Sequence, residues 1–172
     1  KSIPTIYLSR LVDEGSLNRV QRGLYLSEEG VNDEYYFLQH RFTQIIFSHA
    51  TALYFHGLTD LIPNKIVVSV PYSYKINKIP DNLEVRYVKE NIVNLGVTKV
   101  ETNVGNMVNA YDKERTIIDI IINHDYVDRE TYTTAIRKFM KSNDKDINKL
   151  FMYALKMDAI DEVRNVIEVL HE

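Results

Sequence analysis

The sequence predicts an α+β protein in which a small helix–hairpin head precedes a mixed α/β domain with a helical C-terminal part. A short amphipathic helix and two strand-like runs occupy the first 26 residues. Runs between residues 65 and 111 predict strands, and the last sixty residues change to the helical period. We place the domain boundary near residues 27–32, which gives domains 1–30 and 31–172.

Composition excludes several classes of protein. The chain has 172 residues, 45% hydrophobic and 26% charged, as is typical of a folded globular protein. It has no cysteine, which excludes disulfides and thiolate-bound metals. It also lacks a run of roughly 18 apolar residues and a signal-peptide pattern, so we expect a cytoplasmic protein with no membrane partner. Because no phosphate-binding loop, dinucleotide-binding motif or hydrolase elbow occurs, we expect no cofactor and no enzymatic activity.

The charges are distributed unevenly along the chain. The formal net charge is −3. Residues 1–26 nevertheless hold four basic and two acidic side chains, whereas residues 27–111 and 112–172 are both net acidic. A small basic head therefore precedes an acidic body. This asymmetry is meaningful for nucleic-acid binding only if the head also has a suitable shape.

Residues 4–14 predict a short helix. Pro4 suits the start of a helix, and Gly15 supplies a C-terminal stop. Four apolar residues follow the i, i+1, i+4, i+5 pattern that predicts one buried stripe. These are Tyr7, Leu8, Leu11 and Val12. The polar residues between them are expected to project away from the stripe.

A β-hairpin is predicted directly after this helix, from the runs 17–20 and 23–26. A helix with a polar face followed by a basic hairpin is typical of a winged helix-turn-helix, in which the helix enters the major groove and the wing contacts the backbone. We therefore interpret the head as a partial winged helix-turn-helix, consisting of the recognition helix plus wing. The predicted DNA-binding residues are Thr5, Ser9 and Arg10 on the helix and Arg19, Gln21 and Arg22 on the wing.

The rest of the chain is predicted to contain both strands and helices, with the last sixty residues all helical. Strands are expected at residues 65–70, 83–88, 98–103 and 107–111. Helices are expected at residues 33–42, 49–56, 114–123, 129–141, 147–156 and 160–170. The runs 98–103 and 107–111 are expected to pair with each other, because Gly105-Asn106 separates them.

Three blocks of sequence resemble the AbiEi-type antitoxins, which are the antitoxins and transcriptional repressors of type IV abortive-infection toxin–antitoxin systems. Residues 11–25 (LVDEGSLNRVQRGLY) are similar to the family stretch L-v-x-x-G-x-L-x-R-v-x-R-G-x-Y. Residues 47–59 (FSHATALYFHGLT), soon followed by residues 66–71 (IVVSVP), form the second block. Residues 111–120 (YDKERTIIDI) resemble the family pattern y-d-x-e-R-T-x-x-D.

The resemblance implies a winged-helix domain that represses its own operon by binding operator DNA, at inverted repeats upstream of that operon. It implies that the C-terminal domain counteracts a cognate nucleotidyltransferase-like toxin, without a stable complex between the two. In this family two helices precede the recognition helix. Since the chain begins at Lys1 and shows only the recognition helix and wing, we expect an N-terminally incomplete head that binds DNA poorly by itself.

Other clusters of polar residues are better explained by structural roles. His49 and His56 share a helical face but stand roughly 10 Å apart along it, too far to hold one metal ion. We expect Ser48 to cap their helix. The spacing of Arg115 and Asp119 predicts an i,i+4 ion pair.

The sequence also lacks the residues that a metal-dependent nuclease needs. A metal-dependent nuclease core needs an Asp on one strand and Glu-x-Lys on the next. The nearest match is Glu84-Val85-Arg86, and the preceding strand run, residues 65–70, holds no Asp. Two hypotheses remain. The first is an autoregulating antitoxin; the alternative is a non-DNA-binding protein-interaction module of a phage-defence system. Salt-dependent binding to operator DNA distinguishes them.

Overall fold

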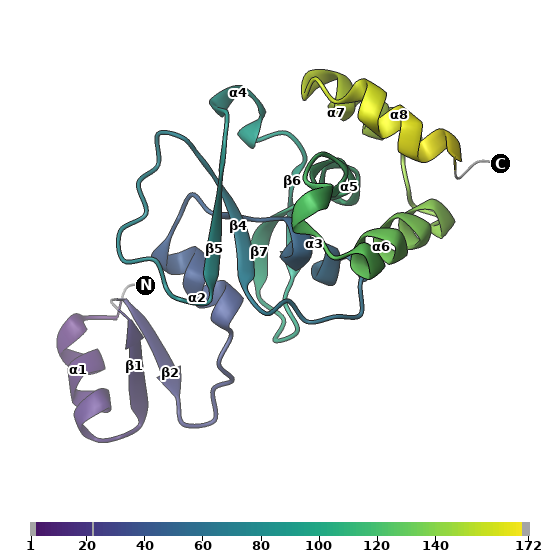
Figure 1. Ribbon diagram of the computed structural model, residues 1–172. Coiled ribbons are helices and arrows are strands. Elements are labelled where there is room, and N and C mark those ends of the chain that lie inside the picture. The colour runs from purple at the N-terminus through teal and green to yellow at the C-terminus, as the bar shows by residue number, and fades with distance from the viewer. Residues whose placement is uncertain (1–2, 22, 170–172) are drawn as a thin grey trace.

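The protein contains a small two-stranded sheet near the N-terminus and a five-stranded sheet in the rest of the chain (Figure 1). The computed structural model describes residues 3–21 and 23–169. The strands are β1 (Leu17–Gln21), β2 (Leu24–Ser27), β3 (Ile46–Phe47), β4 (Ile66–Pro71), β5 (Leu83–Val88), β6 (Val97–Glu101) and β7 (Met107–Tyr111). The helices are α1 (Thr5–Asp13), α2 (Glu34–Arg41), α3 (His49–Phe55), α4 (Glu90–Val93), α5 (Lys113–Ile122), α6 (Arg129–Lys141), α7 (Ile147–Lys156) and α8 (Ile160–Val169), with a 3-10 turn η1 (His124–Tyr126).

The predicted α+β class is confirmed, and the predicted elements lie within a few residues of those observed. Strand β3, the one-turn helix α4 and η1 were not predicted. Strand β3 is only two residues long, which is too short for an alternating pattern to appear in the sequence. None of the helices in the described ranges combines the length and the apolar character needed to cross a membrane.

The larger sheet has the strand order β5-β4-β3-β7-β6. Strand β4 runs parallel to β5 and antiparallel to β3, and β3 runs parallel to β7. The predicted pairing of β6 with β7 is confirmed, and the two strands are antiparallel. Where the short β3 ends, α3 replaces it beside β4. There the hydroxyl of Thr51 accepts a hydrogen bond from the Val67 N–H at 2.8 Å, so that this buried donor is satisfied.

Two apolar clusters hold the larger part together. One lies among the helices that follow the sheet, and includes Ile117, Phe139, Leu150 and Val163. The other joins α2 to the sheet through side chains such as Leu38, Phe42, Phe47 and Val68. Helix α3 contributes to both clusters, because Leu53 belongs to the first and Phe55 packs against the second. The sheet is therefore covered on both faces, as in other layered α/β structures.

Several buried polar contacts meet at the start of α5. The Asp112 carboxylate caps the helix by accepting the Arg115 N–H at 2.9 Å. The Arg115 side chain is 2% exposed, and its Nε lies 2.9 Å from Oδ1 of Asp119, which confirms the predicted ion pair. Its Nη1 also donates to the carbonyls of Ile92 and Leu95, at 2.7 and 3.1 Å. Arg115 thereby binds α5 to the turn between α4 and β6.

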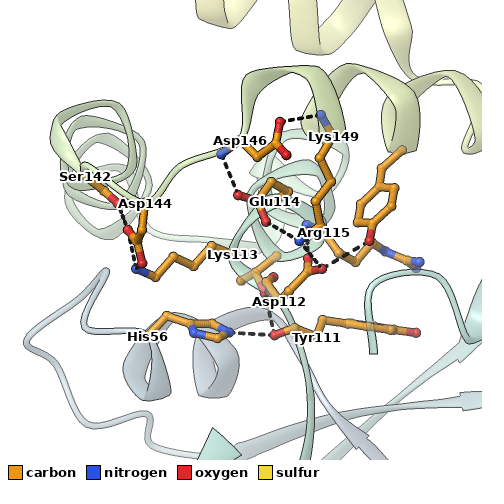
Figure 2. Close-up of polar contacts among 12 residues, drawn as sticks. His56, Tyr111, Asp112, Lys113, Glu114, Arg115, Ser142, Asp144, Asp146 and Lys149 are labelled. Carbon is orange, nitrogen blue, oxygen red and sulfur yellow. Dashed lines mark hydrogen bonds and ion pairs between the residues drawn. The ribbon is translucent and has the colours of Figure 1, made fainter. Parts of the chain in front are cut away.

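The same helix start also holds α7 (Figure 2). Lys149 Nζ lies 3.0 Å from carboxylate oxygens of both Asp112 and Glu114. Glu114 additionally accepts the backbone N–H of Asp146, the residue that caps α7. Lys149 of α7 therefore lies across two carboxylates at the start of another helix.

We expect Arg115→Ala to lower the free energy of unfolding by about 3–5 kcal/mol, because it leaves the buried Asp119 carboxylate without its partner. Urea unfolding followed by circular dichroism measures the change. Arg164→Ala is the matched control, since its ion pairs on α8 are exposed and removal of such pairs costs about 0–1 kcal/mol. Similar losses in the two variants would show that burial of the Arg115 pair does not matter.

Candidate nucleic-acid interface

Helix α1 presents its predicted DNA-reading residues to solvent. Pro4 precedes the helix, and none of the helical residues is buried. Thr5 and Ser9 are four residues apart and exposed, so they share one side of the helix, and Arg10 is exposed beside them. Short hydroxyl side chains and an arginine along one helix are suited to contact base edges and phosphates in a major groove.

The predicted apolar stripe of α1 is only half right. Leu8 and Val12 are partly buried, and α1 packs against β1. Tyr7, by contrast, is 60% exposed and Leu11 is 37% exposed. The prediction assigned these residues to one buried face, but the two-stranded hairpin is too narrow to cover it all. Ile6 is exposed on the same helix and Ile3 is exposed just before it, so several large apolar side chains of this segment stay uncovered.

The hairpin that follows α1 is formed as predicted. Strands β1 and β2 are antiparallel, with Arg19 opposite Tyr25 and an irregularity in register between Arg19 and Gln21. Gly23 has a φ of 79°, which favours glycine at the turn. Arg19 is exposed. The side chain of Gln21 and all of Arg22 lie outside the described residues, so these two predicted contacts stay predictions.

The arginines Arg10 and Arg19 of the head differ in whether a carboxylate lies beside them. Arg10 Nε lies 2.9 Å from Glu14 Oε1, and both side chains are largely exposed. This pair is weak in water, but it places a carboxylate beside the cation. Arg19, among the residues described here, has no ion-pair partner. Arg19 is consequently the described cation of the head best able to contact a phosphate.

The two histidines of α3 have separate environments. His56 Nε2 lies 2.7 Å from the carbonyl oxygen of Tyr111, which ties the end of α3 to β7 (Figure 2). His49 is buried, and its Nδ1 lies 3.0 Å from Ser48 Oγ. Ser48 was expected to cap α3 through its side chain; this was wrong, because its hydroxyl contacts His49 and Ser69 instead. Across the described ranges, no group of three or more metal-ligating side chains could hold an ion.

Comparison with known protein sequences does not assign the chain to a family. No protein-family profile matches the sequence, and a search of curated proteins finds no similar sequence.

Burial lowers the pKa of both His49 and His56 below the ordinary value of 6.5. As the pH falls below 6.5, the unfolded chain binds protons that the folded chain rejects, so the free energy of unfolding decreases. We expect a loss of up to about 1.4 kcal/mol per pH unit for each histidine, down to its folded-state pKa. Urea unfolding at pH 7.5, 6.5 and 5.5 measures this slope.

The variants His49→Gln and His56→Gln assign the slope to individual residues. Each should flatten the dependence between pH 6.5 and 5.5, because glutamine does not titrate. If both variants kept the slope of the original protein, other groups would be responsible for the acid sensitivity.

Proposed function

We propose that this protein is a transcriptional repressor and antitoxin of a type IV abortive-infection toxin–antitoxin system. The observation that carries the proposal is the exposed helix–hairpin head, in which Thr5, Ser9 and Arg10 on α1 and Arg19 on β1 all face solvent. The resemblance of three sequence blocks to AbiEi-type antitoxins supports the same assignment.

In this proposal α1 enters the major groove of operator DNA, at inverted repeats upstream of the protein's own operon. Thr5 and Ser9 read base edges, while Arg19 contacts the phosphates beside the groove. The rest of the chain counteracts a nucleotidyltransferase-like toxin in the cytoplasm, without forming a stable complex with it.

A second candidate function is favoured by the uncovered apolar side chains of α1. Tyr7 is 60% exposed and Ile6 is 76% exposed, which is unusual for two large apolar side chains on one short helix. Such exposed side chains are typical of a protein–protein contact. The alternative is therefore a protein-interaction module of a phage-defence system that does not bind DNA.

Operator binding by the full-length protein tests the first proposal. We expect a specific complex whose affinity falls steeply with salt, because binding releases counterions from DNA. Arg19→Ala and Arg22→Ala should each weaken binding about five-fold and reduce the salt slope by about 1, with similar effects on all sequences. Fluorescence anisotropy with labelled operator and random duplexes, from about 50 to 200 mM salt, measures both quantities.

Two control sets separate base reading from phosphate contact. Thr5→Ala and Ser9→Ala should reduce the preference for operator over random DNA and leave the salt slope nearly unchanged. Arg137→Ala removes an exposed arginine of α6, far along the chain from the head, and should change neither. Equal affinity for operator and random DNA would refute the repressor proposal and favour the interaction module.

Toxin neutralisation is tested separately from DNA binding. The variant Arg19→Ala/Arg22→Ala, expressed from an unrelated promoter, should still restore growth to cells that produce the cognate toxin, because the proposed antitoxin activity resides in residues 31–172. Growth curves at matched protein levels measure this. Loss of protection in the variant would show that neutralisation requires DNA binding, and no protection by the original protein would refute the antitoxin proposal.

A further inference from the structure

A cavity of about 400 Å³ lies beside β5, outside the head. Strand β5 forms one edge of the sheet. Leu83 and Val85 of this strand point into the apolar cluster under α2, so the alternating residues Glu84 and Arg86 belong to the opposite face, where they line the cavity. The cavity is of the size at which proteins hold small organic ligands, about 300–1,000 Å³.

The floor of the cavity places a hydrogen-bond donor next to an acceptor. Arg86 Nη2 lies 2.5 Å from Glu84 Oε1, which holds the two charged groups side by side. Arg86 Nε is buried and, in the described part of the chain, has no hydrogen-bond partner. The guanidinium carbon of Arg86 lies 4.7 Å from the ring centroid of Tyr126, whose side chain is 72% exposed at the rim.

His49 supplies a second, fixed group to this cavity. The residue is 8% exposed and its backbone has a φ of 48°, a conformation that L-residues rarely adopt and that is concentrated at functional sites. Ser69 Oγ donates to Ser48 Oγ at 2.8 Å, and His49 Nδ1 lies 3.0 Å from the same hydroxyl. The Asn123 amide nitrogen, which can only donate, lies 3.5 Å from His49 Nε2, so Nε2 accepts and the proton of the neutral ring is on Nδ1, which donates to Ser48.

The hydroxyl groups of Ser48 and Ser69 orient the His49 ring but do not line the cavity themselves. Ser48 and Ser69 are both fully buried. The Asn123 amide nitrogen, 3.5 Å from His49 Nε2, already donates to the carbonyl of Asp119 at 2.8 Å. The His49 ring is thus held in place by contacts from three elements, β3–α3, β4 and the end of α5. Burial lowers the pKa of His49, which keeps the ring neutral near pH 7.

We propose that this cavity binds an uncharged nitrogen heterocycle of the nucleobase or nucleoside class. Such a molecule carries donors and acceptors on one edge, which match Glu84 and Arg86, and flat apolar faces that can stack on Tyr126. Leu61 and Val127 add apolar surface to the wall, beside the polar side chains of Thr59, Asn64 and Thr131. The charged side chains of the lining balance, with Lys65 and Arg86 against Glu84 and Asp128, so the site does not select an anion.

The site is independent of the head, and its test does not require DNA or toxin. Saturation-transfer NMR with the full chain screens adenine, guanine, cytosine and uracil together with their nucleosides, and isothermal titration calorimetry measures the affinity of those that bind. We expect at least one to bind with a Kd below about 1 mM, and its 5′-monophosphate to bind no more tightly. Absence of binding by every probe at millimolar concentration would overturn the proposal.

Three variants locate the binding. Ala50→Leu fills the cavity from α3, where leucine is well tolerated, and should weaken binding at least ten-fold. Glu84→Gln exchanges an acceptor for an amide and should change the order of preference among the bases. Lys99→Ala, on the opposite edge strand β6, is the control and should have no effect. Thermal unfolding verifies that each variant is folded. Unchanged affinity in folded Ala50→Leu, or tighter binding of the monophosphate, would also overturn the proposal.

Discussion

The arrangement of the larger part of the molecule depends on one buried cation. Arg115 is held by Asp119, by two backbone carbonyls of the turn before β6 and by the ring of Tyr111, 4.3 Å below its guanidinium. Gly96 is required in that turn, because an added Cβ would lie 2.6 Å from the Cβ of Arg115 and the backbone there has a φ of 80°. A buried guanidinium is tolerated only when its donors are satisfied, so sheet, turn and helix must adopt their positions together.

The position of α5 determines two further features of residues 31–172. Its first turn supplies Asp112 and Glu114, whose carboxylates hold Lys149 and thereby fix α7. Its last turn brings Asp119 and Asn123 close to His49, at the back of the cavity beside β5. The cavity exists because β5 is an edge strand, whose residues on this face meet loops and a 3-10 turn instead of a packed helix.

Features set by neighbours in the sequence could be predicted, and features set by distant packing could not. The Asp112 cap and the Arg115–Asp119 pair follow from spacings of three and four residues, and the hairpin follows from two short runs around Gly23. The role of Ser48 was mistaken because its partner, Ser69, lies 21 residues away. Glu84 and Arg86 showed only an incomplete nuclease pattern, since nothing local reveals that Tyr126 lies over them.

The geometry of α1 relates the two functions proposed for the head. Residues two positions apart on a helix differ by about 200° in direction, so Ser9 points away from both Tyr7 and Leu11. Leu8 and Val12, which are partly buried, lie on the remaining side and contact the hairpin. The polar side that would read DNA and the side formed by Tyr7 and Leu11 are therefore different sides of one helix. Ile6, in contrast, is three residues before Ser9 and differs from it by only about 60° in direction, so a protein that covers Ile6 would compete with operator DNA for the same surface.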